Sequence, residues 1–251
     1  MSINGGSATP WIAFGQGHAE TSACRLFCFP CAGAGATLYR PWIERLSPDI
    51  DVCPVQLPGR QERRGESAIL NMGELVCSLA DALAAAMTPP FAFFGHSMGG
   101  LIAFELTREL RRRGELLPSH LLIAASPAPQ LPLGRESLHP LSDDALVAHL
   151  KEMGGTPEKL FEMDWLLQSY LPVLRADLTL YETRTYEPGA PLTVPITAVG
   201  GDRDPFVTAE CLEAWATQTI VAFKRHELRG EHFFLKEARD PLLACVRQAL
   251  C

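Results

Sequence analysis

Three features that would each point to a particular class of protein are missing from this sequence. There is no excess of basic residues: 22 lysines and arginines stand against 29 aspartates and glutamates, and the formal net charge is −7. Nucleic acid is therefore not an expected partner, because proteins that bind it present a basic surface. No apolar run is long enough to span a membrane, so no membrane partner is expected. Residues 1–6 carry neither the basic region nor the apolar core of a secretion signal, which predicts a cytoplasmic protein whose residues 1–20 form a flexible tail and lead-in.

The sequence also lacks a context for disulfide bonds, although it contains 8 cysteines. Without a secretion signal, reduced thiols are expected. Cys24, Cys28 and Cys31 do repeat the Cys-x3-Cys-x2-Cys spacing with which radical-SAM enzymes hold an iron–sulfur cluster. The same segment fits a buried strand over residues 25–29, in which Cys24 and Cys28 would be small core side chains. We favour the strand, and we expect neither a metal nor a cofactor.

What the sequence does contain is enough apolar material for one large domain, since 47% of its 251 residues are hydrophobic. Short apolar runs alternate with segments whose apolar residues recur at helical spacing. This order is typical of an α/β fold with a mostly parallel central sheet flanked by helices. Strands are predicted at residues 26–29, 52–57, 91–94, 121–125, 194–199 and 221–228. Helices are predicted at residues 39–46, 75–83 and 98–113.

The alternation of strands and helices stops between residues 131 and 187. Ser142 is predicted to cap one helix and Asp164 a second, and no strand pattern falls in this span. An insertion of helices at the carboxyl edge of a sheet would cover a site there, so we interpret it as a lid. The chain is thus divided into a first part of the core (21–130), a helical lid insertion (131–187) and a second part of the core (188–251). Two later helices are predicted to begin with Thr208 and Asp240 as caps.

Ser97 lies at the centre of Gly95-His96-Ser97-Met98-Gly99, at the junction of a predicted strand and a predicted helix. A strand that turns at once into a helix forces its central residue into a strained backbone, and only small neighbours let the two elements approach. The serine hydroxyl would then be presented at the carboxyl edge of the sheet, near the positive end of a helix. Ser97 is therefore the predicted nucleophile.

A serine hydroxyl needs a nearby base, and that base needs a carboxylate to fix its tautomer. His232 follows the last predicted strand, whereas His226 lies inside it, so His232 is the predicted base. Asp202 and Asp204 compete for the role of the acid, and Asp204 is favoured because it lies further into the loop. The order of nucleophile, acid and base matches the α/β-hydrolase arrangement, in which all three lie at one edge of the sheet. His96, beside the nucleophile, is expected to support the turn.

The turn of small residues at 30–35 has two open interpretations. It could be an oxyanion loop, with a backbone N–H aimed at the serine, or a plain connection between a strand and a helix. In the mechanism that we expect, His232 takes the proton of Ser97, which attacks an acyl carbonyl. The backbone N–H groups of Ala32 and Met98 would hold the resulting oxyanion, and water would release the acid from the acyl-serine.

Two clusters of charge could bind a partner or substrate but have simpler explanations. The loop at residues 58–64 could contact a substrate phosphate, although such runs are more often solvated surface. Arg111, Arg112 and Arg113 could form a docking patch, but cations at the carboxyl end of a helix also offset its dipole. We favour the surface explanation for both.

Motifs spread along the chain resemble those of the type II thioesterases, stand-alone partners of modular polyketide and nonribosomal peptide synthases. The similarity runs from about residue 11 to the end. It is carried by Phe29-Pro30-Cys31-Ala32-Gly33, Gln56-Leu57-Pro58-Gly59-Arg60, Phe94-Gly95-His96-Ser97-Met98-Gly99-Gly100, Leu171-Pro172-x-Leu174-Arg175-Ala176-Asp177, Gly200-Gly201-x-x-Asp204 and Gly230-x-His232-Phe233-Phe234.

The resemblance implies a serine thioesterase that removes aberrant acyl groups from the phosphopantetheine arm of carrier domains. It also implies that Ala32 supplies an oxyanion N–H and that the insertion is a mobile lid over the acyl chamber. The carrier domains of a synthase are the expected partner, and a monomer is expected. Two alternatives stay open: a medium-chain fatty acyl or product-releasing thioesterase (or general esterase) with the same triad, and a hydrolase fold used only for binding, against which the intact triad argues.

Overall fold

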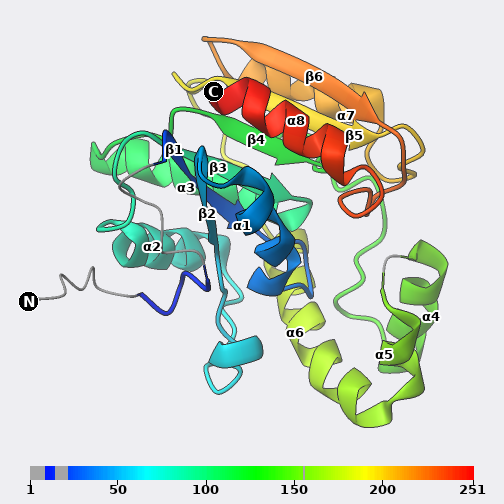
Figure 1. Cartoon of the computed structure of the whole chain (residues 1–251). Helices are drawn as coiled ribbons and strands as arrows, with labels where there is room; N and C mark the ends of the chain where they lie inside the picture. Colours follow the sequence, from blue (N-terminus) through cyan, green and yellow to red (C-terminus); the bar gives the residue numbers. More distant parts are fainter. Residues whose placement is uncertain (1–8, 15–21, 155) are drawn as a thin grey trace, which may run out of the picture.

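The core of the protein is a six-stranded sheet in which every neighbouring pair of strands is parallel (Figure 1). The computed structural model describes residues 9–14, 22–154 and 156–251, so most of the predicted N-terminal tail lies outside the described residues. The spatial order of the strands is β2-β1-β3-β4-β5-β6. Their bounds are β1 Cys24–Phe29, β2 Ile50–Pro54, β3 Phe91–His96, β4 Leu121–Ala124, β5 Ile196–Gly201 and β6 Phe223–Leu228.

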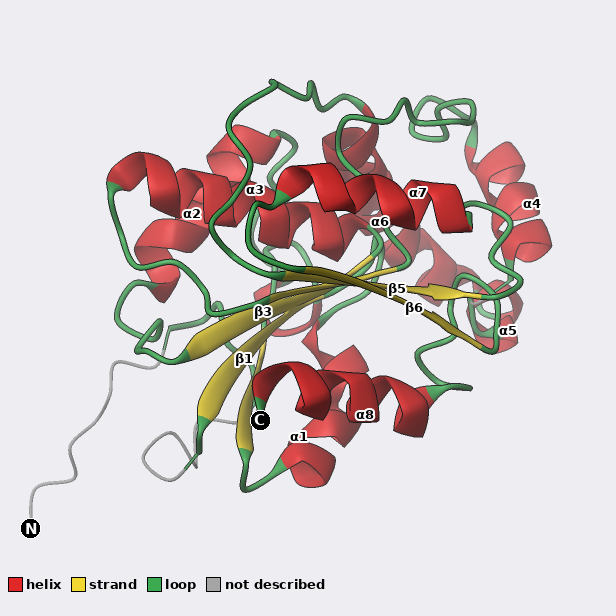
Figure 2. Cartoon of the chain, turned by 90° about the horizontal axis from the view of Figure 1, so that it is seen from above, coloured by secondary structure: helices red, strands yellow, loops and turns green. Residues whose placement is uncertain are grey.

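Helices cover both faces of the sheet, as an all-parallel sheet requires (Figure 2). One face carries α1 (Arg40–Leu46) and α8 (Arg239–Leu250), whose apolar side chains pack with alternate residues of the central strands. The other face carries α2 (Met72–Leu83), α3 (Met98–Arg113) and α7 (Ala209–Glu213). Short 3-10 helices lie at Ala36–Tyr39, Gln61–Arg63 and Ala214–Gln218. The predicted α/β architecture is confirmed.

All regular secondary structure among the described residues of 131–187 is helical. It contains α4 (Asp143–Met153), the short α5 (Glu158–Glu162), which was not predicted, and the long α6 (Asp164–Glu182). Figure 1 shows α4 and α5 beyond the end of the sheet; a long loop leads to them from β4, and α6 leads back. The segment has a small apolar cluster of its own, formed by Leu138, Leu146, Leu150, Leu171, Leu174 and Leu178. The carboxyl end of α6 instead joins the main core through Leu180 and Tyr181.

Some predicted element ends are displaced by a few residues. Ser142 and Thr208 cap α4 and α7 as predicted, each accepting a backbone N–H three residues on. The prediction that Asp164 and Asp240 are caps is wrong: both lie in the first turn of their helices, which begin after Met163 and Ala238. An acidic side chain in the first turn still offsets the positive end of the helix, so the same residue suits either position. The second strand ends at Pro54. The next residue, Val55, still donates its N–H to the carbonyl oxygen of Cys28 on β1, and it also forms an antiparallel bridge with Ile12.

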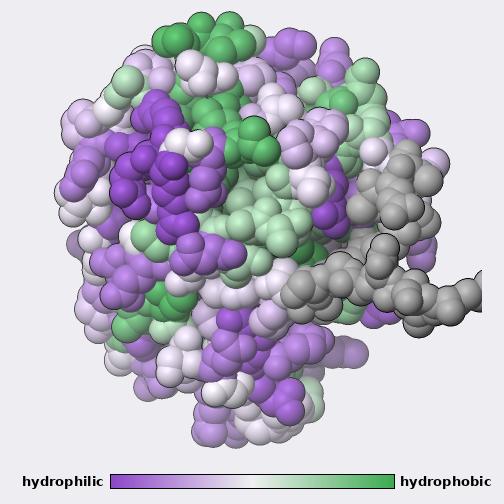
Figure 3. Space-filling model, turned by 90° about the vertical axis from the view of Figure 1, so that its left-hand side faces the viewer, coloured by the Kyte–Doolittle hydropathy of each residue, from purple (hydrophilic) through white to green (hydrophobic). Residues whose placement is uncertain are grey.

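The outer surface mixes polar and apolar side chains. Figure 3 shows hydrophilic side chains interspersed with smaller hydrophobic patches over one face of the molecule. In the part of the chain that the structure describes, no helix combines the length and the apolar character needed to cross a bilayer.

Candidate active site

Ser97 occupies the sharp turn between β3 and α3 in the strained conformation that the sequence predicts. Its φ and ψ are 54° and −118°. The flanking glycines allow this turn because a Cβ atom on Gly95 would lie 2.1 Å from the Gly99 carbonyl oxygen. A Cβ atom on Gly99 would likewise lie 2.1 Å from the carbonyl oxygen of Phe29, on β1. Both glycines are therefore required by close backbone approach.

His232 and Asp204 meet Ser97 at the carboxyl edge of the sheet. The Nε2 atom of His232 lies 3.0 Å from the Ser97 hydroxyl, and its Nδ1 atom lies 2.9 Å from Asp204 Oδ2. The other oxygen of Asp204 accepts the backbone N–H groups of Phe206 and Val207, which fixes the carboxylate. The carboxylate holds the proton on Nδ1, so that Nε2 is free to accept the serine proton. The structure thus brings the three predicted residues together.

The competing residues have other surroundings. Asp202 accepts the backbone N–H of Gly230 at 2.9 Å, and so joins the loops that follow β5 and β6. His226 lies within β6, as predicted. The imidazole of His232 is the one that contacts both a carboxylate and the serine among the described residues.

The ring of His96 contacts the backbone of His232. Its Nε2 atom lies 2.9 Å from the carbonyl oxygen of His232. Complete burial, with the nearby His232 adding to it, lowers the pKa of His96 to about 3, so the ring is neutral at physiological pH. A neutral ring that donates from Nε2 holds the His232 loop against the turn after β3, which confirms the supporting role that the sequence predicts.

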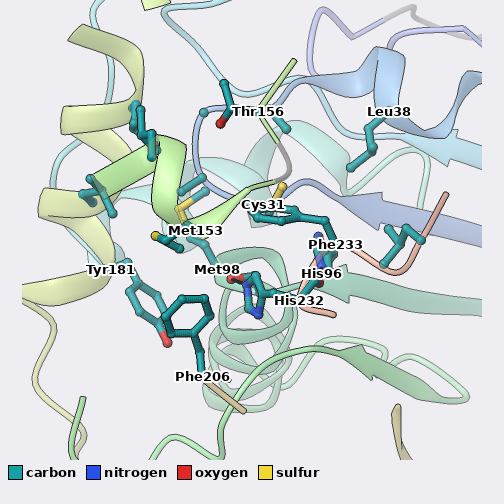
Figure 4. A pocket seen from close by; sticks show the side chains of 18 of the residues that line it. Cys31, Leu38, His96, Met98, Met153, Thr156, Tyr181, Phe206, His232 and Phe233 are labelled. Atoms are coloured by element: carbon teal, nitrogen blue, oxygen red, sulfur yellow. Dashed lines mark hydrogen bonds between the residues drawn. The ribbon is translucent and has the colours of Figure 1, made fainter. Parts of the chain in front are cut away.

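A cavity of about 650 Å³ opens above Ser97. Its walls combine residues of the core, such as Cys31, Met98 and Phe206, with residues of the helical segment, such as Met153 and Tyr181 (Figure 4). The lining contributed by the helical segment is largely apolar, which suits an acyl chain. The thiol of Cys31 also faces this cavity, but burial raises its pKa to about 12, so it stays protonated and is a poor nucleophile.

Ala32 and Met98 both line the cavity beside the serine. Met98 is the first residue of α3, and its N–H therefore has no acceptor within the helix. Ala32 lies in the turn that follows β1. That the backbone N–H groups of these two residues bind the oxyanion stays a prediction.

The prediction that the charged loop at residues 58–64 is solvated is wrong for two of its arginines. Arg60 and Arg63 are each only 6% exposed. Arg63 donates to the carbonyl oxygen of Gln56 and lies 4.1 Å over the ring of Trp11. Arg60 forms an ion pair with Asp177 of α6, which is 3% exposed. Both partners of this pair lie in motifs that carry the family resemblance, but their contact is invisible in the sequence because 117 residues separate them.

The arginines at the end of α3 are engaged within the molecule. Arg111 donates to the carbonyl oxygens of Ala190 and Pro191, while Arg112 and Arg113 both pair with Glu109. Their position at the carboxyl end of the helix is as predicted.

The described residues hold no group of three or more His, Cys, Asp or Glu side chains that could bind a metal ion. Cys24 and Cys28 lie on β1 and pack in the core, which confirms the strand interpretation of this cysteine-rich segment.

Comparison with known proteins identifies the family. A family model described as a thioesterase domain matches residues 24–250. This chain belongs to the thioesterase family. A thioesterase named RedJ, from the prodiginine biosynthetic pathway of Streptomyces coelicolor, is 42% identical to it, with a TM-score of 0.87 over 92% of this chain and 91% of that one. The type II thioesterase BorB, from the borrelidin biosynthetic cluster, is 40% identical, with a TM-score of 0.88 over 96% and 98% of the two chains.

A curated relative of this thioesterase carries a name of another kind. LgrE of Brevibacillus parabrevis, called linear gramicidin dehydrogenase, is 40% identical over 247 residues, which cover 97% of this chain and 94% of that protein. The family model and the geometry around Ser97 both belong to hydrolases rather than to dehydrogenases. The protein is thus a type II thioesterase of the kind found with polyketide and nonribosomal peptide synthases, and its site is that of a serine hydrolase.

Proposed function

We propose that this thioesterase hydrolyses acyl groups from the phosphopantetheine arm of carrier domains, and so edits aberrant acyl units on a polyketide or nonribosomal peptide synthase. One observation carries the proposal: Ser97, His232 and Asp204 form a connected chain of hydrogen bonds at the base of a cavity with an apolar wall. The arrangement suits an acyl thioester, whose apolar chain needs a dry wall and whose carbonyl needs a nucleophile.

The reaction follows from the geometry. His232 takes the proton of Ser97 at Nε2 as the serine oxygen attacks the thioester carbonyl, and Asp204 stabilises the imidazolium that forms. The N–H groups of Ala32 and Met98 stabilise the oxyanion. The carbon–sulfur bond then breaks, and the thiolate of the arm receives the proton from His232. Water, activated by the same histidine, attacks the acyl-serine and releases the free acid.

The helical segment at residues 131–187 would be the lid of this site. Several of its apolar side chains line the cavity above the serine, and many of these belong to a cluster separate from the main core. The division into core and lid, action as a monomer and a cytoplasmic location remain parts of the proposal.

The experiment that tests the proposal compares two forms of one substrate. A short acyl group is offered on a phosphopantetheinylated carrier protein and on a small free thiol, with wild type and Ser97→Ala side by side. We expect turnover that depends on Ser97 and is much faster on the carrier. Turnover that persists unchanged in Ser97→Ala would sink the assignment of the nucleophile, and equal rates on both substrates would remove the role of the carrier.

A series of chain lengths separates editing from product release. Flat activity, or a preference for short acyl groups, supports editing. A strong preference for one medium or long chain would favour the medium-chain or product-releasing alternative.

A further inference from the structure

We propose that Asp177 and Arg60 are positioning residues, which hold the turn at Cys31–Ala34 so that the N–H of Ala32 faces the reacting carbonyl. This turn is called the oxyanion turn below. The inference rests on the proposed function, and it gives a role to two family motifs that the catalytic chain of hydrogen bonds does not use.

The carboxylate of Asp177 binds the oxyanion turn directly and through Arg60. Asp177 Oδ2 accepts the backbone N–H of Gly33 at 2.8 Å and the Nη1 of Arg60 at 2.5 Å. Its second oxygen accepts Arg60 Nη2 at 2.7 Å, so the pair is bidentate. The Nη1 of Arg60 also donates to the carbonyl oxygen of Ala34 at 3.0 Å. The two side chains therefore contact the peptide groups on the carboxyl side of Ala32.

The internal geometry of the turn explains why an acceptor is needed there. The N–H of Ala34 donates to the carbonyl oxygen of Cys31 at 3.1 Å, which closes a four-residue turn. Gly33, at the third position, has a φ of +74°, as a type II turn requires. Type I and type II turns differ by a flip of their central peptide, here the one between Ala32 and Gly33. An acceptor fixed on the Gly33 N–H thus selects one orientation of the peptide next to the proposed donor.

The acceptor comes from the helix that also forms a wall of the cavity. Asp177, Leu174 and Tyr170 lie along one side of α6 at helical spacing. A Cβ atom on Gly33 would lie 2.4 Å from the Tyr170 hydroxyl, so the helix packs directly on the turn. Ala32 itself packs against the apolar cluster of the helical segment. The position of α6 and the shape of the oxyanion turn are therefore coupled.

The chemistry of the pair favours positioning over stability as its role. A buried N–H needs an acceptor, and a buried carboxylate needs a cation. Replacing a buried ion pair by apolar side chains is often neutral for stability. A variant without either charge can therefore fold and still lack the acceptor for the Gly33 N–H.

The decisive comparison uses two double variants of similar side-chain size, one with and one without an acceptor at position 177. Arg60→Met/Asp177→Asn keeps a side-chain oxygen for the Gly33 N–H, and Arg60→Met/Asp177→Leu has none. Rates are measured on acyl N-acetylcysteamine thioesters, together with the affinity for a trifluoromethyl ketone, which forms a tetrahedral oxyanion on the serine. For the leucine form we expect kcat to fall roughly tenfold or more, KM to change less than about threefold, and ketone affinity to fall in parallel. The asparagine form should recover most of the loss.

Asp51→Asn is the matched control. It removes the charge from another arginine–aspartate pair, formed at 3.0 Å by the partly exposed Arg25 and the buried Asp51, at the amino ends of β1 and β2. We expect this variant to lose stability but to keep kcat and ketone affinity within about twofold of wild type. Arg60→Lys is a second test: one ammonium cannot bridge both carboxylate oxygens, so kcat should fall about threefold or more.

The inference is overturned if the leucine and asparagine forms have the same kcat, if the loss appears in KM alone, or if Asp51→Asn loses kcat to the same degree. Should the leucine form not fold, Arg60→Lys decides, and wild-type kcat and ketone affinity in that variant would overturn the inference. Because these substrates need no carrier, failure of the carrier-domain proposal would leave this test intact. A wild type inactive on every thioester would count against the proposed function itself.

Discussion

Ser97 has a backbone conformation that residues with a side chain rarely adopt, and its neighbours enforce it. Strain of this kind costs about 1–3 kcal/mol for each residue. Conformational strain at a nucleophile is consistent with selection for activity at the expense of stability, since the hydroxyl gains access to both the base and the cavity.

Replacement of Ser97 separates strain from catalysis. Ser97→Ala and Ser97→Gly should both abolish thioester hydrolysis, but glycine tolerates the conformation. We expect the free energy of unfolding of Ser97→Gly to exceed that of Ser97→Ala by about 1 kcal/mol, measured by urea denaturation. This would reverse the order normally seen outside turns, and an alanine form that is the more stable of the two would refute the strain argument.

Two histidines, the fully buried His96 and the partly buried His120, link stability to pH. Burial lowers the pKa of His96 to about 3 and that of His120 to about 4, below the ordinary value near 6.5. Between about pH 6.5 and pH 4 the unfolded chain binds protons that the folded chain does not, so the free energy of unfolding should fall as the pH falls through this window. Urea denaturation at several pH values measures the slope.

His120→Gln gives the control for this pH dependence. His120 contacts Thr197 at 2.8 Å and lies away from Ser97, and glutamine can keep a hydrogen bond there without titrating. We expect the slope to become shallower in this variant. A slope identical to that of wild type would show that His120 contributes nothing to the acid sensitivity.

At the scale of elements, the site depends on how closely α3 approaches β1. Gly99 is the contact point, where backbone meets backbone and neither element can yield locally. The strand, turn and helix therefore form a single rigid unit around the serine.

Substitution of Gly99 tests this close approach. Gly99→Ala would place a methyl group against the carbonyl oxygen of Phe29. We expect the free energy of unfolding to fall by about 3 kcal/mol or more and the activity to be lost. Gly65→Ala is the control, because a Cβ atom there meets nothing within 4 Å. Thermal denaturation of the two variants should differ widely, and similar melting temperatures would contradict the required close contact.

At the scale of the whole molecule, apolar side chains gather in two clusters on the faces of the sheet and a third within the helical segment. Regions with few buried contacts open locally at a lower free energy than the core does. We therefore expect the central sheet to be more stable against local unfolding than α4 and α5.

Hydrogen exchange would detect this difference. We expect the amides of α4 and α5 to exchange faster than those of β3 and β4, and an acyl inhibitor bound to Ser97 to slow the helical amides selectively. Equal protection of these helices and the central strands in the free protein would contradict the expectation that α4 and α5 open independently of the sheet.

The sequence alone determined the features that depend on short-range patterns. Apolar runs and helical spacing located the strands and the main helices, and the glycines around Ser97 predicted its strained turn. The choice of Asp204 and His232 rested on their places in the loops, on the chain order of the three residues, and on the rule that the carboxyl ends of parallel strands meet at one edge. The structure brings both side chains to Ser97. Element ends were less certain, because Asp164 and Asp240 suit a cap and a first turn equally well.

Only the tertiary structure decided which charged residues far apart in the chain are buried and paired. Arg60 lies in a run of charged residues that looks solvated, and Asp177 lies on an amphipathic helix. Burial of either charge is favourable only when the other reaches it, and 117 residues separate them. The same long-range packing placed Asp177 on the turn after β1, because α6 crosses that turn only in the folded chain.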